Sequence, residues 1–153
     1  MRVLAGLAET KLEGIIVGNV AAILHGAPVT TQDLDLIVRD TPRNRTKIEA
    51  LGAYLGARPQ PISPLTATLR IDAAPGTVDL LFDQIAGGLR FQSLRSRARK
   101  IEVGPHHALV ARLEDVIASK EAAGRPKDRA VLPILRDTLR IKQALDRRSK
   151  PGS

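Results

Sequence analysis

The sequence predicts an α/β (α+β) fold in which helices flank a mixed sheet and a small helical C-terminal region follows. Two patterns predict it: strand-like apolar runs alternate with helical segments in the first part of the chain, and helical spacing dominates from Leu109 onward. Hydrophobic residues make up 43% of the 153 and aromatic residues only 2%, so one core of Leu, Ile, Val and Ala is expected. We expect a single domain with its core in residues 1–105, a helical region in 106–148 and a disordered tail in 149–153.

The first elements are short. Residues 14–18, GIIVG, predict a buried strand that turns at its final glycine. Residues 20–25 predict a short helix that begins after Asn19 and stops at Gly26. Residues 33–38, DLDLIV, alternate acidic and apolar side chains and then become fully apolar, which is a strand pattern.

The middle of the chain predicts a helix and then a strand pair. Residues 41–44, TPRN, begin a helix that carries an apolar face and ends near Gly56. After a proline-rich loop, residues 66–72 and 76–82 predict two strands. The basic run at 97–103 is typical of an exposed edge strand.

Two helices are expected at the C-terminal end. Residues 109–124 have apolar side chains at helical spacing and a terminal glycine. Residues 125–128, RPKD, begin a second helix that continues through Leu145. Pro133 either kinks this helix or lies in the first turn of a shorter one.

Several classes of protein are excluded by composition. With no cysteine, the chain has no disulfide framework, no Cys-ligated zinc site and no thiol nucleophile. No apolar run approaches the roughly 20 residues of a membrane span. Glu9, Lys11 and Glu13 interrupt the region where a signal peptide would be apolar, so we expect a cytoplasmic protein with no membrane partner.

The positive charge is concentrated in the second half of the chain. The net charge is +8 overall, and it is −1 over residues 1–89 and +9 over residues 90–153. This asymmetry favours an anionic partner, with nucleic acid first and a polyphosphate substrate next. A solvated basic surface that keeps the protein soluble is the alternative.

Three carboxylates carry the candidate chemistry. Asp33 and Asp35 are two residues apart, so on a strand they share one face with Cα atoms roughly 6–7 Å apart. Asp79 on a later strand could complete the cluster. Clustered carboxylates without a cation repel one another, and their expected partner is a hard divalent ion, Mg²⁺ or Mn²⁺. Gly18 and Asn19 join a strand to a helix start, where backbone N–H groups can approach a phosphate.

Each of these features has a structural alternative. A pair of aspartates on one strand is usually a solvated face, and a glycine after a strand is usually an ordinary turn. His25 closes the first short helix and is expected to cap it. His106 and His107 follow Gly104-Pro105 in an expected loop, with no neighbours suited to a zinc site.

The order of the motifs resembles the nucleotidyltransferase superfamily with the polymerase-beta-type fold. The superfamily has a hydrophobic residue, Gly, then Gly or Ser, about a dozen residues, Asp-x-Asp, and a third acidic residue on a later strand. The corresponding residues here are Val17, Gly18, Asn19, Asp33, Asp35 and Asp79. Together with residues 118–128, ASKEAAGRPKD, the stretch from Val17 to Val38 looks most like the minimal bacterial abortive-infection and toxin–antitoxin branch. Two residues depart from the pattern: Asn19 replaces Gly or Ser, and Val29 stands where many relatives carry Arg.

The resemblance implies a two-metal, NTP-dependent transferase that moves a nucleoside monophosphate to an acceptor hydroxyl. Asp33, Asp35 and Asp79 would be the catalytic and metal-binding residues, and Gly18 and Asn19 would hold the phosphates. Lys120 and Asp128 match positions that relatives use near the nucleotide. Ordinary helix surface and a helix cap, respectively, are the alternatives for these two residues. The implied partners are the NTP, an antitoxin and an acceptor. RNA such as tRNA is the favoured acceptor, and another protein or a small molecule such as an aminoglycoside stays open.

We expect the basic second half to recognise the RNA, through Arg95, Arg97 and Arg99. Two other classes of function stay open. One is a catalytically degenerate member that binds a nucleotide or a partner protein, which metal-dependent NTP turnover would distinguish from an enzyme. The other is a basic nucleic-acid-binding module in which the aspartates are incidental.

Overall fold

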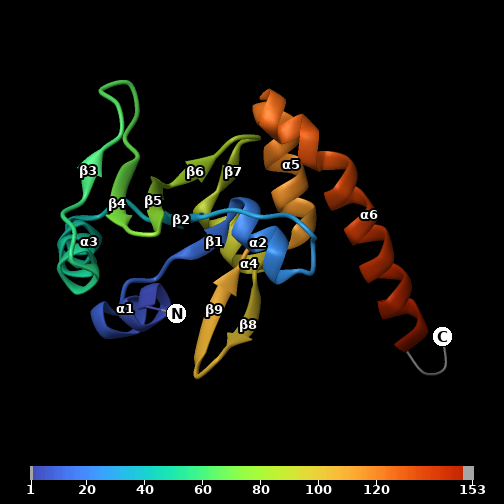
Figure 1. The fold of residues 1–153 in the computed structure, drawn as a ribbon, viewed down its shortest axis with the longest axis horizontal. Coiled ribbons are helices and arrows are strands. Elements are labelled where there is room, and N and C mark those ends of the chain that lie inside the picture. The colour runs from blue at the N-terminus through green and yellow to red at the C-terminus, as the bar shows by residue number, and fades with distance from the viewer. Residues whose placement is uncertain (1, 150–153) are drawn as a thin grey trace.

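The computed structural model describes residues 2–149, and one seven-stranded sheet lies at its centre (Figure 1). The strand order in this sheet is β3-β4-β5-β2-β1-β9-β8, and β6 pairs only with β7. The strands are β1 Ile15–Val17, β2 Asp33–Val38, β3 Gln60–Pro61, β4 Leu69–Ala73, β5 Gly76–Phe82, β6 Gln84–Ile85, β7 Leu89–Arg90, β8 Arg99–Val103 and β9 His106–Val110. The helices are α1 Arg2–Thr10, α2 Gly18–Leu24, α3 Pro42–Leu55, α4 Phe91–Arg97, α5 Leu113–Ala123 and α6 Pro126–Ser149.

The sheet is mixed, as the sequence predicts. β2 is parallel to β5, and β1 is parallel to β9, while the β1–β2, β3–β4, β4–β5 and β8–β9 pairs are antiparallel. β2 and β5 therefore lie side by side although α3 and two strands separate them in the chain. This parallel pair positions the carboxylates of the candidate site.

Period-2 alternation explains why β2 and β5 form where they do. Leu34 and Leu36 on β2 are buried, as are Val78 and Leu80 on β5, while the aspartates between them point to the opposite face. β2 then ends in a fully buried Ile37-Val38 pair. The core that these strands share is aliphatic, with Phe91 its single buried aromatic residue in the described part of the chain.

Helices cover the sheet and its ends. α1 contacts α3, and α2 contacts α5, which in turn packs against α6. α6 then extends away from the sheet at the C-terminal end of the molecule (Figure 1). Within residues 2–149 no helix combines the length and apolar character that crossing a membrane requires.

The helical region begins later than the sequence predicts. The expected helix over 109–124 starts at Leu113, because residues 106–110 form β9. Ala108 and Val110 are buried, and Val110 pairs with Ile16 of β1, so tertiary pairing inside the sheet overrides a local helical pattern. His106 and His107 consequently lie on a strand rather than in a loop. The expected division after residue 105 thus falls between two strands of one sheet.

α6 is longer than expected and contains Pro133. The helix runs on through Leu145 to Ser149, so the alternative of a short helix starting at Pro133 is wrong. The proline occurs inside the helix, where it removes one backbone hydrogen bond without ending the element. Residues 150–153 of the expected tail lie outside the described residues.

Candidate active site

Three aspartates line one cavity on the face of β2 and β5. Asp35 and Asp79 are partners in the parallel register, and Asp33 is the partner of Thr77, two residues before Asp79. All three side chains line a cavity of about 550 Å³. The geometry that the sequence spacing predicts, with the carboxylates on one sheet face, is therefore present.

The three carboxylates differ in how they are held. Thr77 Oγ1 donates to Asp33 Oδ1 at 2.8 Å. Arg70 donates from Nε and Nη2 to the two oxygens of Asp79, at 2.7 and 2.9 Å. Asp35 lies between Asp33 and Asp79, and no hydrogen bond to its carboxylate occurs within residues 2–149.

Asp35 is the electrostatically unusual member of the cluster. Burial, followed by the charges of Asp79 and Asp33, raises the pKa of its carboxyl to about 6, although Lys120 and Lys127 oppose the shift. Burying a charge without a partner costs free energy, so the folded protein favours the protonated form of this group. A cation placed against Asp35 would remove that cost.

Gly18 lets the turn between β1 and α2 approach Asp35. Its backbone is left-handed, with φ +68°, and a Cβ atom there would lie 2.5 Å from Oδ2 of Asp35. Asn19 follows in the first turn of α2 and also lines the larger cavity. Its buried Oδ1 has no hydrogen-bond partner in the described part of the chain. This turn therefore brings an unsatisfied amide and free helix N–H groups beside the carboxylates.

Lys120 and Asp128 approach the same cavity from α5 and α6. Lys120 Nζ is 3.7 Å from Asp128 Oδ1, and the two side chains are 12% and 1% exposed. Burial lowers the pKa of Lys120, although Asp128 opposes this shift. Lys120 is therefore not an open-surface lysine.

Asp128 caps a helix, as one of its two sequence interpretations predicts, and it also lines the cavity. It accepts a hydrogen bond from the backbone N–H of Arg125 at 3.2 Å, which caps the start of α6. The Arg125 guanidinium also donates to it, at 2.7 and 3.2 Å. Burial opposes ionisation of Asp128, but these bonds outweigh it and lower the pKa of the carboxyl. The carboxylate thus orients two cations at the cavity wall.

A second cavity of about 400 Å³ adjoins the first. Both cavities are lined by Asp35, Leu81, Lys120, Arg125 and Asp128. The smaller one is otherwise mostly apolar, and its wall is completed by Val17, Gly18, Ile85, Ala86, Ala111, Asp115, Val116, Ser119 and Ala123. The site therefore has a charged compartment and an apolar compartment on either side of Asp35 and Lys120.

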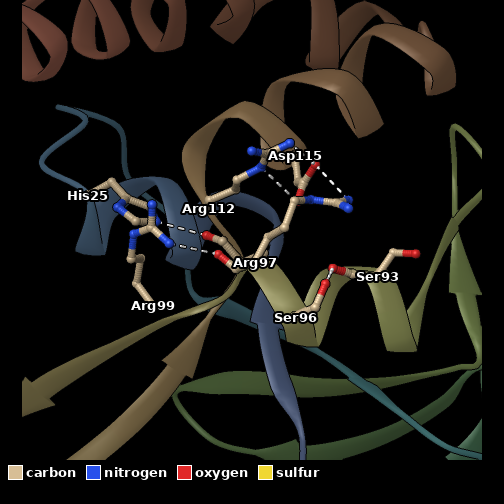
Figure 2. A network of polar contacts seen from close by, with 8 residues as sticks. His25, Ser93, Ser96, Arg97, Arg99, Arg112 and Asp115 are labelled. Atoms are coloured by element: carbon tan, nitrogen blue, oxygen red, sulfur yellow. Dashed lines mark hydrogen bonds and ion pairs between the residues drawn. The ribbon is translucent and has the colours of Figure 1, made fainter.

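The three arginines expected to bind nucleic acid have contacts within the protein. Arg95 donates to Glu13 at 2.8 and 3.1 Å, and Arg97 donates to Asp115 at 2.9 and 3.1 Å. Arg99 donates to the Arg97 carbonyl at 3.0 Å. Figure 2 shows Arg97 and Arg112 beside Asp115, and Arg99 close to His25. The role of these arginines in RNA binding stays a prediction.

The Arg97–Asp115 pair is expected to stabilise the fold. Asp115 is only 5% exposed, so Arg97→Gln leaves a buried carboxylate with Arg112 as its remaining cation. The free energy of unfolding should fall by about 2 kcal/mol. Arg95→Gln is the matched control, because its pair with Glu13 is half exposed on both sides and should matter far less. Urea denaturation measures both, and equal effects would contradict this assignment.

His25 fulfils its expected position at the end of α2 and adds a longer-range contact. It is the C-cap residue of α2, and its Nε2 lies 2.8 Å from the carbonyl oxygen of Ala111. Its Nδ1 lies 3.1 Å from Nζ of Lys142 on α6. The ring therefore links the end of α2 to α6 and to the segment that follows β9. Burial lowers the pKa of its imidazole.

Sequence reasoning missed Arg70 and Arg125. Arg70 reaches the site because it is the antiparallel partner of Asp79 in the β4–β5 hairpin. The alternation in residues 66–72 could have placed its side chain on the aspartate face once the hairpin register was known. Arg125 comes from the α5–α6 turn, and its position three residues before Asp128 is the signal that could have found it.

The donor set fits a divalent cation at Asp33 and Asp35. Both offer carboxylate oxygens, and Asp35 is mostly buried without a hydrogen-bond donor. Asp79 is different because Arg70 occupies both of its oxygens. Among residues 2–149, no three His, Cys, Asp or Glu side chains are arranged to hold a metal ion. A cation that used Asp79 would lie beside the Arg70 guanidinium, which bonds the same two oxygens.

Comparison of the fold with solved structures gives a consistent result. The chain matches the solution structure of the antibiotic-resistance factor ANT(2″)-Ia with a TM-score of 0.63, at 16% identity over 95% of this chain and 88% of that one. The chain therefore shares the fold of this resistance factor. TM1012 of Thermotoga maritima, assigned as a nucleotidyltransferase, matches with a TM-score of 0.60, at 15% identity over 86% of each chain.

A second structure of ANT(2″)-Ia, in complex with adenylyl-2″-tobramycin, matches this chain with a TM-score of 0.60. The identity is 16%, over 97% of this chain and 95% of that one. No family model matches the sequence, and no curated protein matches it either. The mixed sheet with flanking helices thus agrees with the fold that the sequence motifs imply.

Proposed function

We propose that this protein is a nucleotidyltransferase that moves a nucleoside monophosphate from an NTP to an acceptor hydroxyl. The observation that carries the proposal is the state of the Asp35 carboxylate. It has no hydrogen bond within the described residues, and Asp33 and Asp79 lie on either side of it. Gly18 approaches the same carboxylate. In the reaction, the acceptor oxygen forms a bond to the α-phosphorus. The bond between the α-phosphorus and the oxygen that bridges it to the β-phosphate breaks. The acceptor loses its proton and pyrophosphate leaves.

Asp33 and Asp35 would hold two divalent cations, Mg²⁺ or Mn²⁺, and Asp79 would help to hold the one that activates the acceptor oxygen. Such an ion supplies charge stabilisation to a transferring phosphoryl group and orients the attacking and leaving oxygens. Once released from Arg70, Asp79 would also accept the proton of the acceptor hydroxyl.

The nucleotide would occupy both compartments. Gly18 and Asn19 would bind the β- and γ-phosphates at the start of α2, with the Asn19 side-chain amide turned to present its Nδ2 donor. Lys120, held by Asp128, would offset charge that develops on the phosphoryl group. The apolar cavity lined by Ile85, Val116 and small side chains is suited to a nucleobase.

The test is a transfer assay with Mg²⁺ and each of the four NTPs labelled on the α-phosphate, run in parallel with total cell RNA and with total cell lysate as the source of acceptor. We expect label from at least one NTP to appear on an acceptor, and chelation with EDTA to prevent it. Absence of labelling with all four NTPs, in total RNA and lysate alike, would contradict the proposal.

The acceptor class proposed here is RNA, such as tRNA, because the second half of the chain is strongly basic. A toxin role, with an antitoxin as its partner, and a cytoplasmic location belong to the same hypothesis. ANT(2″)-Ia, by contrast, is seen with an adenylylated tobramycin. The assay therefore distinguishes two results: label on RNA supports the proposed acceptor class, and label on a small molecule contradicts it.

The basic edge strand β8 gives the RNA prediction a clean test. Arg99 and Lys100 are exposed, and neither holds a buried carboxylate, unlike Arg97. Arg99→Glu with Lys100→Glu should lower RNA affinity about tenfold at low salt and reduce the salt dependence of binding. Filter binding over a salt series measures both. Unchanged RNA affinity would mean that Arg99 and Lys100 face solvent and do not contact RNA.

A further inference from the structure

The larger cavity contains a bidentate ion pair, between Arg70 and Asp79, that has no part in the proposed reaction so far. It lies on β4 directly opposite Asp79 of β5, and its Nε and Nη2 bond the two carboxylate oxygens in a bidentate pair. Such a pair fixes both the position and the plane of the carboxylate. Asp79 is therefore held in place by a cation that belongs to the protein.

The two partners differ in freedom to move. The side chain of Asp79 is 13% exposed, whereas that of Arg70 is 43% exposed. Arg70 lines the larger cavity together with Lys120, Arg125 and Lys127. An arginine released from Asp79 would still line this cavity, which also holds those three cations, and its fork of donors matches the oxygens of a phosphate.

We propose that Arg70 and a divalent cation compete for Asp79, and that the displaced guanidinium then binds a phosphate of the NTP in the same cavity. This inference rests on the proposed function. Competition between Arg70 and the cation explains why Asp79 is bonded to Arg70 in the metal-free protein, while Asp33 and Asp35 are free to bind a cation. Arg70 is accordingly a positioning residue in the metal-free protein and a substrate contact in the loaded one.

Competition is measured by Mn²⁺ binding without any nucleotide, using isothermal titration calorimetry. Arg70→Gln removes the competing charge, so the Kd for Mn²⁺ should fall about fivefold. Arg70→Lys keeps a charge but loses the bidentate geometry, and its Kd should lie between those of Arg70→Gln and the wild type. The control is Arg45→Gln, because Arg45 forms a similar bidentate pair with Asp40 outside the cavity, at 2.8 and 3.0 Å.

Phosphate binding is measured separately with α,β-methylene ATP and α,β-methylene GTP at saturating Mn²⁺. We expect Arg70→Gln to raise the Kd of the analogue that the wild type binds by about tenfold, and Arg45→Gln to leave it unchanged. These measurements need no acceptor and no turnover. A failed transfer assay would contradict the proposed function, while tighter Mn²⁺ binding by Arg70→Gln would still support competition at Asp79.

Two results would overturn the inference. If Arg70→Gln and Arg70→Lys bind Mn²⁺ as the wild type does, or more weakly, Arg70 does not compete with the cation. If Mn²⁺ binding tightens but the affinity for both analogues stays the same, the displaced guanidinium does not contact phosphate. Circular dichroism establishes that each variant is folded, and Arg70→Lys keeps the test decisive if Arg70→Gln does not fold.

Discussion

Replacing Asp35 by asparagine is expected to lower nucleotidyl transfer by at least about 1,000-fold. Asparagine keeps the size of the side chain but removes the negative charge that would hold the cation between Asp33 and Asp79. The fold should persist, because the buried part of β2 is supplied by Leu34, Leu36 and their neighbours. Initial rates of label transfer measure the loss, and circular dichroism verifies the fold. Transfer within tenfold of the wild type would remove Asp35 from the catalytic assignment.

The same variant should be more stable than the wild type in metal-free buffer. The pKa of Asp35 is about 6 in the folded protein against an ordinary value of 3.8, so the folded state binds the proton more tightly than the unfolded state does. The wild type therefore loses stability as the pH rises from about 4 to about 6, and the ionised group costs on the order of 2 kcal/mol above that range.

The expected difference in Tm between Asp35→Asn and the wild type is negligible near pH 4. It grows to roughly 4–8 °C at pH 7 and above. Calorimetry in EDTA across this pH range measures it, and added Mg²⁺ should reduce it by stabilising the wild type. A constant difference at all pH values would mean that ionisation of Asp35 is not its cause.

Gly18→Ala is expected to damage both the fold and the site. At φ +68° alanine costs roughly 1–2 kcal/mol of backbone strain, and its Cβ would also meet Oδ2 of Asp35 at 2.5 Å. Because the Asp35 carboxylate must shift, transfer should fall about 100-fold beyond what lost stability explains.

The matched control is Gly56→Ala. Gly56 is also left-handed, at φ +82°, but a Cβ atom there meets nothing within 4 Å. It should lose similar stability and keep its transfer rate at a temperature where the protein is folded. Full activity in Gly18→Ala would show that the site tolerates a side chain at this turn, and it would contradict the close approach to Asp35.

The site strands could be predicted because their sequence pattern and their burial coincide. DLDLIV over residues 33–38 and GTVDLLF over residues 76–82 alternate polar and apolar side chains, and the structure has strands with these same bounds. The order of Gly18, Asp33, Asp35 and Asp79 then indicated one carboxylate cluster. Local chemistry sufficed here, since each aspartate is placed by its own strand.

Other elements depend on tertiary contacts that local sequence does not encode. β9 forms because Val110 pairs with β1 and residues 106–110 pair with β8, although its apolar spacing continues into a helix. α1 and α4 carry no strong start signals and were not predicted. Arg70 was missed for a related reason: its contact with Asp79 follows from the register of a hairpin, and the register is not visible in either strand alone.

The central claim is that Asp33, Asp35 and Asp79 support transfer of a nucleoside monophosphate, which contains the α-phosphate of the NTP, to the acceptor. The most direct measurement uses the NTP and acceptor that the assay identifies, in parallel reactions labelled on the α-phosphate or on the γ-phosphate, with pyrophosphate counted in each. The account predicts that only the α-label reaches the acceptor, that one pyrophosphate is released per transfer, and that Asp35→Asn does neither. Transfer of the γ-label, or equal transfer by the wild type and Asp35→Asn, would contradict it.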